Sequence, residues 1–314
     1  MPVRTDSTRS TFSGTDVALV LALALMWGVS FLFIKVAVTD VSPLWVVAGR
    51  TSIGAGVLAV ILVARGRRLP TDRALWKHLA IIGLMSNMLP WLLLAWAEQD
   101  ISSGLASVLN ALVPSMTLVV AVAVGIERLT VHRVAGLFLA LGGTVVAVWS
   151  ELGSGGDTLA TLAVVAATIL YGIGTVYAKR HVSGRLGALD VAAGQILVSA
   201  VVTTIAALAF SGLPTGLELD SAGALVGLGA LGTGLAFVAF YELLERVGPT
   251  SATLVTYLIP VVGLTAGAVV LGERFGANVI VGLGIIISGI WLAQRESLPA
   301  GGPEPEFEVL VRDG

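Results

Sequence analysis

The chain has 314 residues, of which 56% are hydrophobic and only 12% are charged, and its mean hydropathy is +0.95. A soluble domain usually carries about 25% charged residues, so this composition excludes an ordinary soluble protein and indicates an integral membrane protein. The net charge of -2 and the dispersed basic residues argue against a nucleic-acid partner, and the absence of cysteine excludes disulfides, thiolate metal clusters and a cysteine nucleophile.

The first predicted element is a retained transmembrane helix. It follows a polar segment, residues 1–16, and its apolar run of about 22 residues exceeds the roughly 7–15 residues of a signal-peptide core. Runs of roughly 20 apolar residues, enough to cross a hydrocarbon core about 30 Å thick, recur along the chain. They predict ten spans, at 17–38, 43–65, 76–98, 102–126, 133–149, 158–180, 188–211, 222–245, 251–273 and 277–295. The turns between them are too short to hold a soluble domain.

The two ends of the chain are expected to lie on the cytoplasmic side. Residues 1–16 form a predicted N-terminal tail, and residues 297–314 are rich in Gly, Pro and Glu and are predicted to be disordered. Lys and Arg are retained on the cytoplasmic side of a membrane, and with both termini inside 15 of the 18 basic residues fall there. The exceptions are Lys35, Arg50 and Arg274. We predict a multi-pass protein of a bacterial inner (plasma) membrane.

An internal repeat is centred on two prolines. Segment 106–114 aligns with segment 252–260, and each ends in a proline, Pro114 or Pro260, that a Glu-Arg pair follows 13 residues later. A proline within a span frees backbone carbonyls and permits a bend. We therefore predict that both prolines are hinges.

The repeat extends over two halves, residues 17–149 and 158–294. The same offset aligns two pairs of glycines, Gly136 with Gly282 and Gly143 with Gly289. Five spans per half is an odd number, so the second half must enter the membrane upside down relative to the first. Inverted repeats of this kind recur among secondary transporters, which hold their substrate near the midplane where the halves meet. The predicted fold is thus all-α, with ten transmembrane helices in two inverted five-helix repeats.

Several short patterns recur in the order seen in one known family. They are Trp27-Gly28 with Lys35 after it, Gly49-Arg50, and the two segments from Leu109 to Glu127 and from Leu254 to Glu273. Together they resemble the EamA branch of the drug/metabolite transporter superfamily over the whole membrane region. The resemblance implies a transporter or exporter of small metabolites such as amino acids or their derivatives. It does not identify the solute, the coupling ion or the oligomeric state.

Polar residues within the spans are the candidate binding residues, because burying them in lipid is costly unless they face a partner or a water-filled cavity. For Arg50 two interpretations stay open: it reaches to the outer surface, or it attracts a carboxylate or phosphate on the solute pathway. Lys35 is expected to reach to the surface. Amide, phenol and indole groups suit a solute with a carboxylate, an amine and some apolar surface. The predicted substrate-binding residues are Trp27, Arg50, Asn87, Asn110, Tyr171, Gln195, Thr256 and Tyr257.

Two carboxylates near the span ends, Glu98 and Glu242, are candidates for proton exchange if they are partly desolvated. The alternative interpretation is an ordinary carboxylate at the membrane interface. The first span contains no carboxylate, unlike that of the small multidrug-resistance relatives, so proton-coupled export of a lipophilic cation by that route is not expected.

No sequence motif supports an enzymatic activity. The segment 227–232 matches G-x-G-x-x-G, but it lies inside an apolar span rather than between a strand and a helix. The three histidines have no metal-ligand spacing, and HExxH and G-x-S-x-G motifs are absent. We therefore expect no enzyme activity, no metal and no cofactor. The alternatives to a solute transporter are a lipid scramblase or flippase, which needs a groove open to lipid, and a membrane scaffold.

Overall fold

The computed structural model describes residues 13–149, 155–182, 184–252 and 255–294, in which there are helices and no strand. Most of the predicted N-terminal tail and all of the predicted tail 297–314 lie outside these residues. The helices are α1 (Gly14–Ala37), α2 (Pro43–Ala64), α3 (Arg73–Gly83), η1 (Leu84–Met88), α4 (Leu89–Ala97), α5 (Ser103–Asn110), α6 (Val113–Ala123), α7 (Val131–Ala147), α8 (Gly155–His181), α9 (Ala188–Phe210), α10 (Leu219–Gly229), η2 (Ala230–Leu235), α11 (Ala236–Ala252), α12 (Val255–Val270) and α13 (Ala277–Gln294). The predicted all-α fold is confirmed for the described part of the chain.

Eight stretches of helix among the described residues are long and apolar enough to cross a membrane. They are α1, α2, α3 to α4 through η1, α5 to α6, α8, α9, α10 to α11 through η2, and α13. Helices α7 and α12 are also apolar but shorter, with 17 and 16 residues. Continuous helices are the expected solution, because a chain in lipid must satisfy its own backbone hydrogen bonds. The chain is a multi-pass membrane protein, and the count of ten spans stays a prediction.

Short polar residues and glycines set the helix ends. Ser42 begins α2 by accepting the Trp45 N–H, and Pro43 stands in the first turn, where no N–H is needed. Ser102 begins α5 in the same way. Gly66 follows the end of α2 with φ +63°, a left-handed conformation that side chains disfavour.

The two aligned prolines affect their helices differently. Helices α5 and α6 are interrupted at Ala111 and Leu112, just before Pro114, which lies in the first turn of α6. Pro260 lies inside α12, which continues through it. The two prolines therefore differ in this conformation, since the chain leaves the helix just before Pro114 and stays helical at Pro260. That both are hinges stays a prediction.

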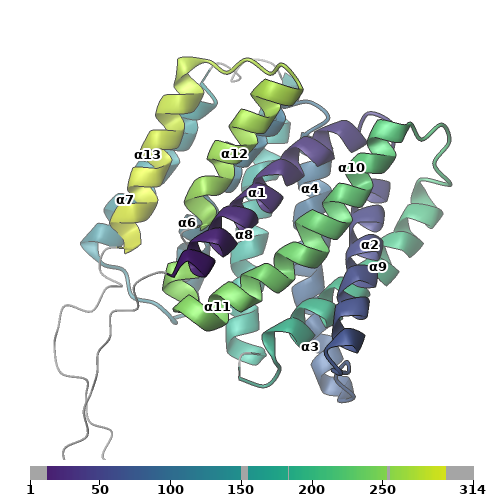
Figure 1. Cartoon of the computed structure of the whole chain (residues 1–314). Helices are drawn as coiled ribbons and strands as arrows, with labels where there is room; N and C mark the ends of the chain where they lie inside the picture. Colours follow the sequence, from purple (N-terminus) through teal and green to yellow (C-terminus); the bar gives the residue numbers. More distant parts are fainter. Residues whose placement is uncertain (1–12, 150–154, 183, 253–254, 295–314) are drawn as a thin grey trace, which may run out of the picture.

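Helices α7 and α13 lie side by side at one edge of the bundle (Figure 1) and approach closely at glycines. A β-carbon on Gly143 would lie 2.8 Å from the carbonyl oxygen of Gly282, and one on Gly136 would collide with that of Gly289. Helix backbones come this close only where small residues leave room. These contacts do not join the aligned glycines. Gly136 aligns with Gly282 but touches Gly289, and Gly143 aligns with Gly289 but touches Gly282. A self-complementary contact of this kind is typical of a two-fold axis.

Arginines gather at one end of the bundle, where Arg65, Arg67 and Arg246 line one hollow. At this end, the basic end, Arg67 pairs with Asp190 at 3.2 Å and Arg246 pairs with Asp16 at 2.6 Å. The hydrogen bond to the Asp16 carboxylate raises the pKa of Arg246. Helix α1 begins and α13 ends towards the lower side of the molecule in Figure 1. We call the opposite end of the bundle the Lys35 end, after the residue in the last turn of α1.

Candidate functional site

A cavity of about 590 Å³ lies within the bundle, walled by α1, α2, α3, η1, α4, α5, α6, α8, α9, α11 and α12. Exposed residues at the basic end, Lys179 and Gly184, belong to its lining. Towards the Lys35 end it stops at Ile34 and Leu94, whose exposed fractions are only 2% and 3%. The cavity is therefore open at the basic end and closed at the Lys35 end.

Arg50 on α2 lies in the cavity wall and is buried. Its Nε donates to the Thr233 hydroxyl at 2.9 Å, and one Nη donates to the Gly232 carbonyl at 3.3 Å. Both acceptors belong to η2, and the Thr233 hydroxyl in turn donates to the Leu228 carbonyl. The guanidinium carbon lies 3.7 Å from the centroid of the Trp91 ring. No carboxylate among the described residues forms an ion pair with Arg50, so its charge is held in place without a counter-ion.

The π-helical turn η1 presents polar groups to the cavity. It ends two residues before Pro90, whose missing N–H leaves the carbonyl of Ser86 without its usual helical donor. A wider turn at such a place is common at functional sites. Ser86 and Asn87, both within η1, line the cavity.

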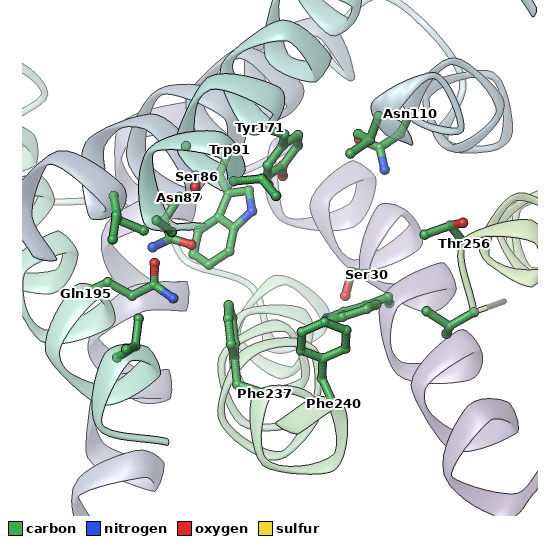
Figure 2. Close-up of a pocket in the computed structure, with 18 of the residues that line it drawn as sticks. Ser30, Ser86, Asn87, Trp91, Asn110, Tyr171, Gln195, Phe237, Phe240 and Thr256 are labelled. Atoms are coloured by element: carbon green, nitrogen blue, oxygen red, sulfur yellow. The ribbon is translucent and has the colours of Figure 1, made fainter. Parts of the chain in front are cut away.

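Unpaired amide groups lie on two sides of the cavity. Figure 2 shows the side chains of Asn87 and Gln195 close together on one side, and those of Asn110 and Thr256 on another. Asn87 Nδ2, Gln195 Oε1 and Asn110 Oδ1 are buried and have no hydrogen-bond partner among the described residues. Buried amides are normally paired, so these three atoms are suited to bind a polar ligand.

Aromatic rings form the walls between these polar groups. Trp91 and Tyr171 lie on one side of the open space in Figure 2, and Phe237 and Phe240 lie on the other. The ring of Phe240 packs against Trp27, with 5.4 Å between the centroids. Rings give a large apolar contact area with few rotatable bonds. The cavity thus combines an apolar middle with polar groups at its margins.

The structure brings together seven of the eight predicted binding residues: Trp27, Arg50, Asn87, Asn110, Tyr171, Gln195 and Thr256 line the cavity. Tyr257 does not belong to the lining, and its hydroxyl donates to Gln294 Oε1 at 2.7 Å. Neighbouring residues on a helix point in different directions, so Thr256 faces the cavity while Tyr257 faces α13. Of the predicted hinges, Pro260 lines the cavity and Pro114 does not.

The lining residues that were not predicted include Ser30, Phe237 and Phe240. Ser30 lies one turn after Met26, to whose carbonyl its hydroxyl donates at 2.7 Å. The two phenylalanines look like ordinary core or lipid-facing residues in an apolar run. Only the spacing of three from Phe237 to Phe240, which puts both on one helix face, hints at a shared role.

The Lys35 end is closed by a polar network. The Lys35 ammonium donates to the carbonyl of Glu98 at 2.6 Å and to that of Ile101 at 2.9 Å. Lys35 was expected to reach to the surface. Instead, its ammonium binds two carbonyls of the α4–α5 connection, which supply the acceptors that water would offer at the surface. These two hydrogen bonds join the end of α1 to that connection.

Glu273 completes this closure from the α12–α13 connection. Its carboxylate accepts from the Ser103 N–H at 2.8 Å, the Ser103 hydroxyl at 3.0 Å and the Gly104 N–H at 3.1 Å. An acidic group is favourable at a helix N-terminus, here that of α5. We call the group formed by Lys35, Glu98, Ile101, Ser103, Gly104 and Glu273 the plug.

The two candidate proton-exchanging carboxylates have different surroundings. Glu98 is completely buried within the plug, and neither of its carboxylate oxygens has a hydrogen-bond partner among the described residues. Glu242 is exposed and lines a separate polar hollow of about 410 Å³ at the basic end, together with Arg65, Arg67 and Arg246. The prediction of proton exchange depended on desolvation of the carboxyl group, and of these two residues only Glu98 is desolvated.

Comparison with known proteins gives a consistent picture. The model of the EamA-like transporter family matches residues 15–149 and 158–294. The Uncharacterized inner membrane transporter YedA of Escherichia coli (strain K12) is 30% identical over 281 residues, which is 86% of this chain and 88% of that protein. The Probable terminal-alkyne amino-acid exporter of Streptantibioticus cattleyicolor is 27% identical, over 90% of this chain and 93% of that protein. A crystal structure with 22% sequence identity shares the fold, with a TM-score of 0.64 over 91% of this chain and 99% of that one.

Proposed function

Since the chain belongs to the EamA-like transporter family, we propose that it exports a small metabolite across the bacterial inner membrane by alternating access. The proposed solute is an amino acid or a related amphoteric or acidic compound. The observation that carries this proposal is Arg50, a buried arginine in the cavity wall that has no counter-ion among the described residues.

Arg50 is suited to bind an anionic group. Two of its guanidinium nitrogens donate to Thr233 and Gly232, and its central carbon lies against the Trp91 ring. The guanidinium is thereby fixed in orientation, which favours the planar, bidentate binding of a carboxylate. A buried charge without a partner is costly, and a solute carboxylate would supply that partner.

The other groups in the cavity suit the rest of such a solute. The unpaired atoms of Asn87, Gln195 and Asn110 are donors or acceptors for polar substituents. The rings of Trp91, Tyr171, Phe237 and Phe240 suit an apolar body between them. The relative from Streptantibioticus cattleyicolor, named an amino-acid exporter, agrees with this class of solute.

The proposed mechanism rests on ten spans in two inverted repeats, residues 17–149 and 158–294. The two ranges that match the family model support this division, as does the crossed glycine contact between α7 and α13. The π-helical turns support it too, because η1 and η2 interrupt the spans that would be third in each repeat. With the basic end in the cytoplasm, as the distribution of Lys and Arg favours, the cavity faces inward and both termini are cytoplasmic.

The lipid scramblase or flippase has less support than the solute transporter. Arg50, Asn87 and Gln195 have exposed fractions of 5%, 1% and 4%, so the polar groups are enclosed in the protein rather than arranged along a groove facing lipid. A scaffold would be expected to have a filled core, whereas a cavity of about 590 Å³ lies here.

Transport by purified protein in proteoliposomes tests the proposal, with counterflow of radiolabelled amino acids and related acids. We expect Arg50→Gln to weaken the apparent affinity for a transported carboxylate by roughly 10- to 150-fold, the equivalent of a charged hydrogen bond. Arg50→Lys keeps the charge but loses the planar fork and should be intermediate. Arg68→Gln, which removes an exposed arginine outside the cavity lining, is the matched control. Unaltered affinity in Arg50→Gln would contradict the role of Arg50.

A further inference from the structure

The carboxyl group of Glu98 is enclosed beyond the closed end of the cavity. Glu98 is the C-cap residue of α4, one turn after Leu94, which lines the cavity. Its exposed fraction is 0%, and both oxygens lack a hydrogen-bond partner among the described residues. An ionised carboxylate is strongly disfavoured in such surroundings, whereas the neutral acid is tolerated. The geometry therefore favours a proton bound to Glu98 in this conformation.

The charged groups around Glu98 do not supply an ion pair. Those that act on it are Lys35 from α1, Arg50 from α2 and Glu273 from the α12–α13 connection. The Lys35 ammonium contacts the backbone carbonyls of Glu98 and Ile101 rather than the carboxyl group. Arg50 is held by η2. Glu273 is itself acidic, and its position at the start of α5 adds a repulsive charge.

Opening of the Lys35 end would change these surroundings. The α4–α5 connection carries Glu98, supplies both carbonyl acceptors of Lys35 and leads into the N-terminus that Glu273 contacts. A pathway through this end requires the plug to separate, which breaks these contacts and admits water to Glu98. In water a carboxyl group ionises readily at neutral pH. The closed plug thus holds one proton more than the open plug.

We infer that Glu98 is a proton-binding site, which takes up a proton as the Lys35 end closes and releases it as this end opens. The inference rests on the proposed transport function, because alternating access is what requires this end to open. The closed state binds the proton, so a rise in pH favours opening and a fall in pH favours closure. Movement of solute through this end is then linked to the proton concentration outside it.

Infrared difference spectroscopy tests for the bound proton without any solute. The full-length protein in lipid at neutral pH should show the C=O stretching band of a protonated carboxylic acid that Glu98→Gln lacks. Glu273→Gln is the matched control, because the Glu273 carboxylate is hydrogen-bonded to α5 and should contribute no such band. Absence of an acid band in the difference between the native protein and Glu98→Gln would overturn the inference.

Thiol labelling tests the link between the proton and opening. The chain contains no cysteine, so a single cysteine is a unique reporter. Ile101→Cys lies in the plug at a residue with 3% exposure, so its labelling rate reports opening. Gln99→Cys lies nearby at an exposed residue, so its labelling rate corrects for the pH dependence of the thiol reaction itself. The ratio of their labelling rates by an impermeant maleimide should rise by up to about tenfold per pH unit through the titration of Glu98.

The same ratio should be independent of pH when Glu98→Gln is added, because the amide has no proton to release. An equal pH dependence with and without Glu98→Gln would overturn the proton link. If Glu98→Gln does not fold, Glu98→Asp should shift the midpoint of the pH dependence, and an unshifted midpoint would count against the site. Neither readout uses a solute, so a protein that transports nothing in counterflow would refute the proposed function while leaving the proton site measurable.

Discussion

The guanidinium of Arg50 lies over the indole ring of Trp91, with 3.7 Å between its central carbon and the ring centroid. Helices α2 and α4 contribute one residue each, so this contact holds the charge on one side of the cavity. A cation over an aromatic face is stabilised by about 0.5 to 2 kcal/mol, depending on how well water is excluded.

We expect Trp91→Leu to weaken solute binding by about 2- to 30-fold, the equivalent of that energy. The guanidinium would lose the surface that orients it, while the hydrogen bonds to η2 would remain. Counterflow at several solute concentrations measures the change. Trp91→Phe keeps an aromatic face and should lose less; equal losses in the two variants would show that the ring itself is unimportant.

Asn87 provides a test that separates binding from stability. Its Nδ2 is buried without a hydrogen-bond partner, so Asn87→Leu removes a polar group that contributes little to folding. The thermal midpoint should stay the same or rise, while the apparent affinity for solute falls by about 2- to 12-fold.

The control for Asn87 is Thr51→Val. The Thr51 hydroxyl donates to the Val47 carbonyl at 2.8 Å and lies 3.0 Å from the Thr203 hydroxyl, outside the cavity lining. This variant should lose about 0.5 to 1.5 kcal/mol of stability with unchanged affinity. If Asn87→Leu is destabilised and binds normally, Asn87 has a structural role.

Two adjacent glycines of α7 should respond oppositely to alanine. A methyl group at Gly143 would press on the backbone of Gly282, so Gly143→Ala should lower stability by about 1 to 3 kcal/mol. Gly142 has open space where its β-carbon would be, so Gly142→Ala should be neutral or stabilising by up to about 1 kcal/mol. Thermal unfolding in detergent compares the two. Similar midpoints would show that α7 and α13 are less closely packed than described.

Single cysteines test the proposed orientation. With the basic end in the cytoplasm, Ser102→Cys and Thr215→Cys should react with an impermeant maleimide added to intact cells. Thr71→Cys and Gly184→Cys should react only after permeabilisation. Labelling of all four from the same side would exclude the inverted arrangement.

Helix positions were predictable because the length of an apolar run is a local property. The predicted spans 43–65 and 188–211 correspond closely to α2 (Pro43–Ala64) and α9 (Ala188–Phe210). Seven of the residues that line the cavity were predicted from a related principle, that polar side chains within apolar spans avoid lipid. The direction of a side chain around its helix was less predictable: Thr256 lines the cavity, whereas the neighbouring Tyr257 does not.

Contacts between distant segments were not predictable. The acceptors of Arg50 lie more than 180 residues away along the chain and include a backbone carbonyl, which any residue possesses. Lys35 likewise binds two backbone carbonyls, which have no sequence signature. The π-helical turns had only indirect signals, Pro90 after η1 and the glycines of η2.

The glycine contact between α7 and α13 contributes to packing and lies apart from the residues proposed to bind the solute. No residue of either helix lines the cavity, yet their backbones touch at two places. Changes in the lining could therefore retune solute preference without disturbing this contact. A chimera that keeps α7 and α13 but takes the lining of η1, α4 and α11 from a relative should inherit the solute preference of the relative. The same fold can in this way bind different solutes while the packing of α7 against α13 stays the same.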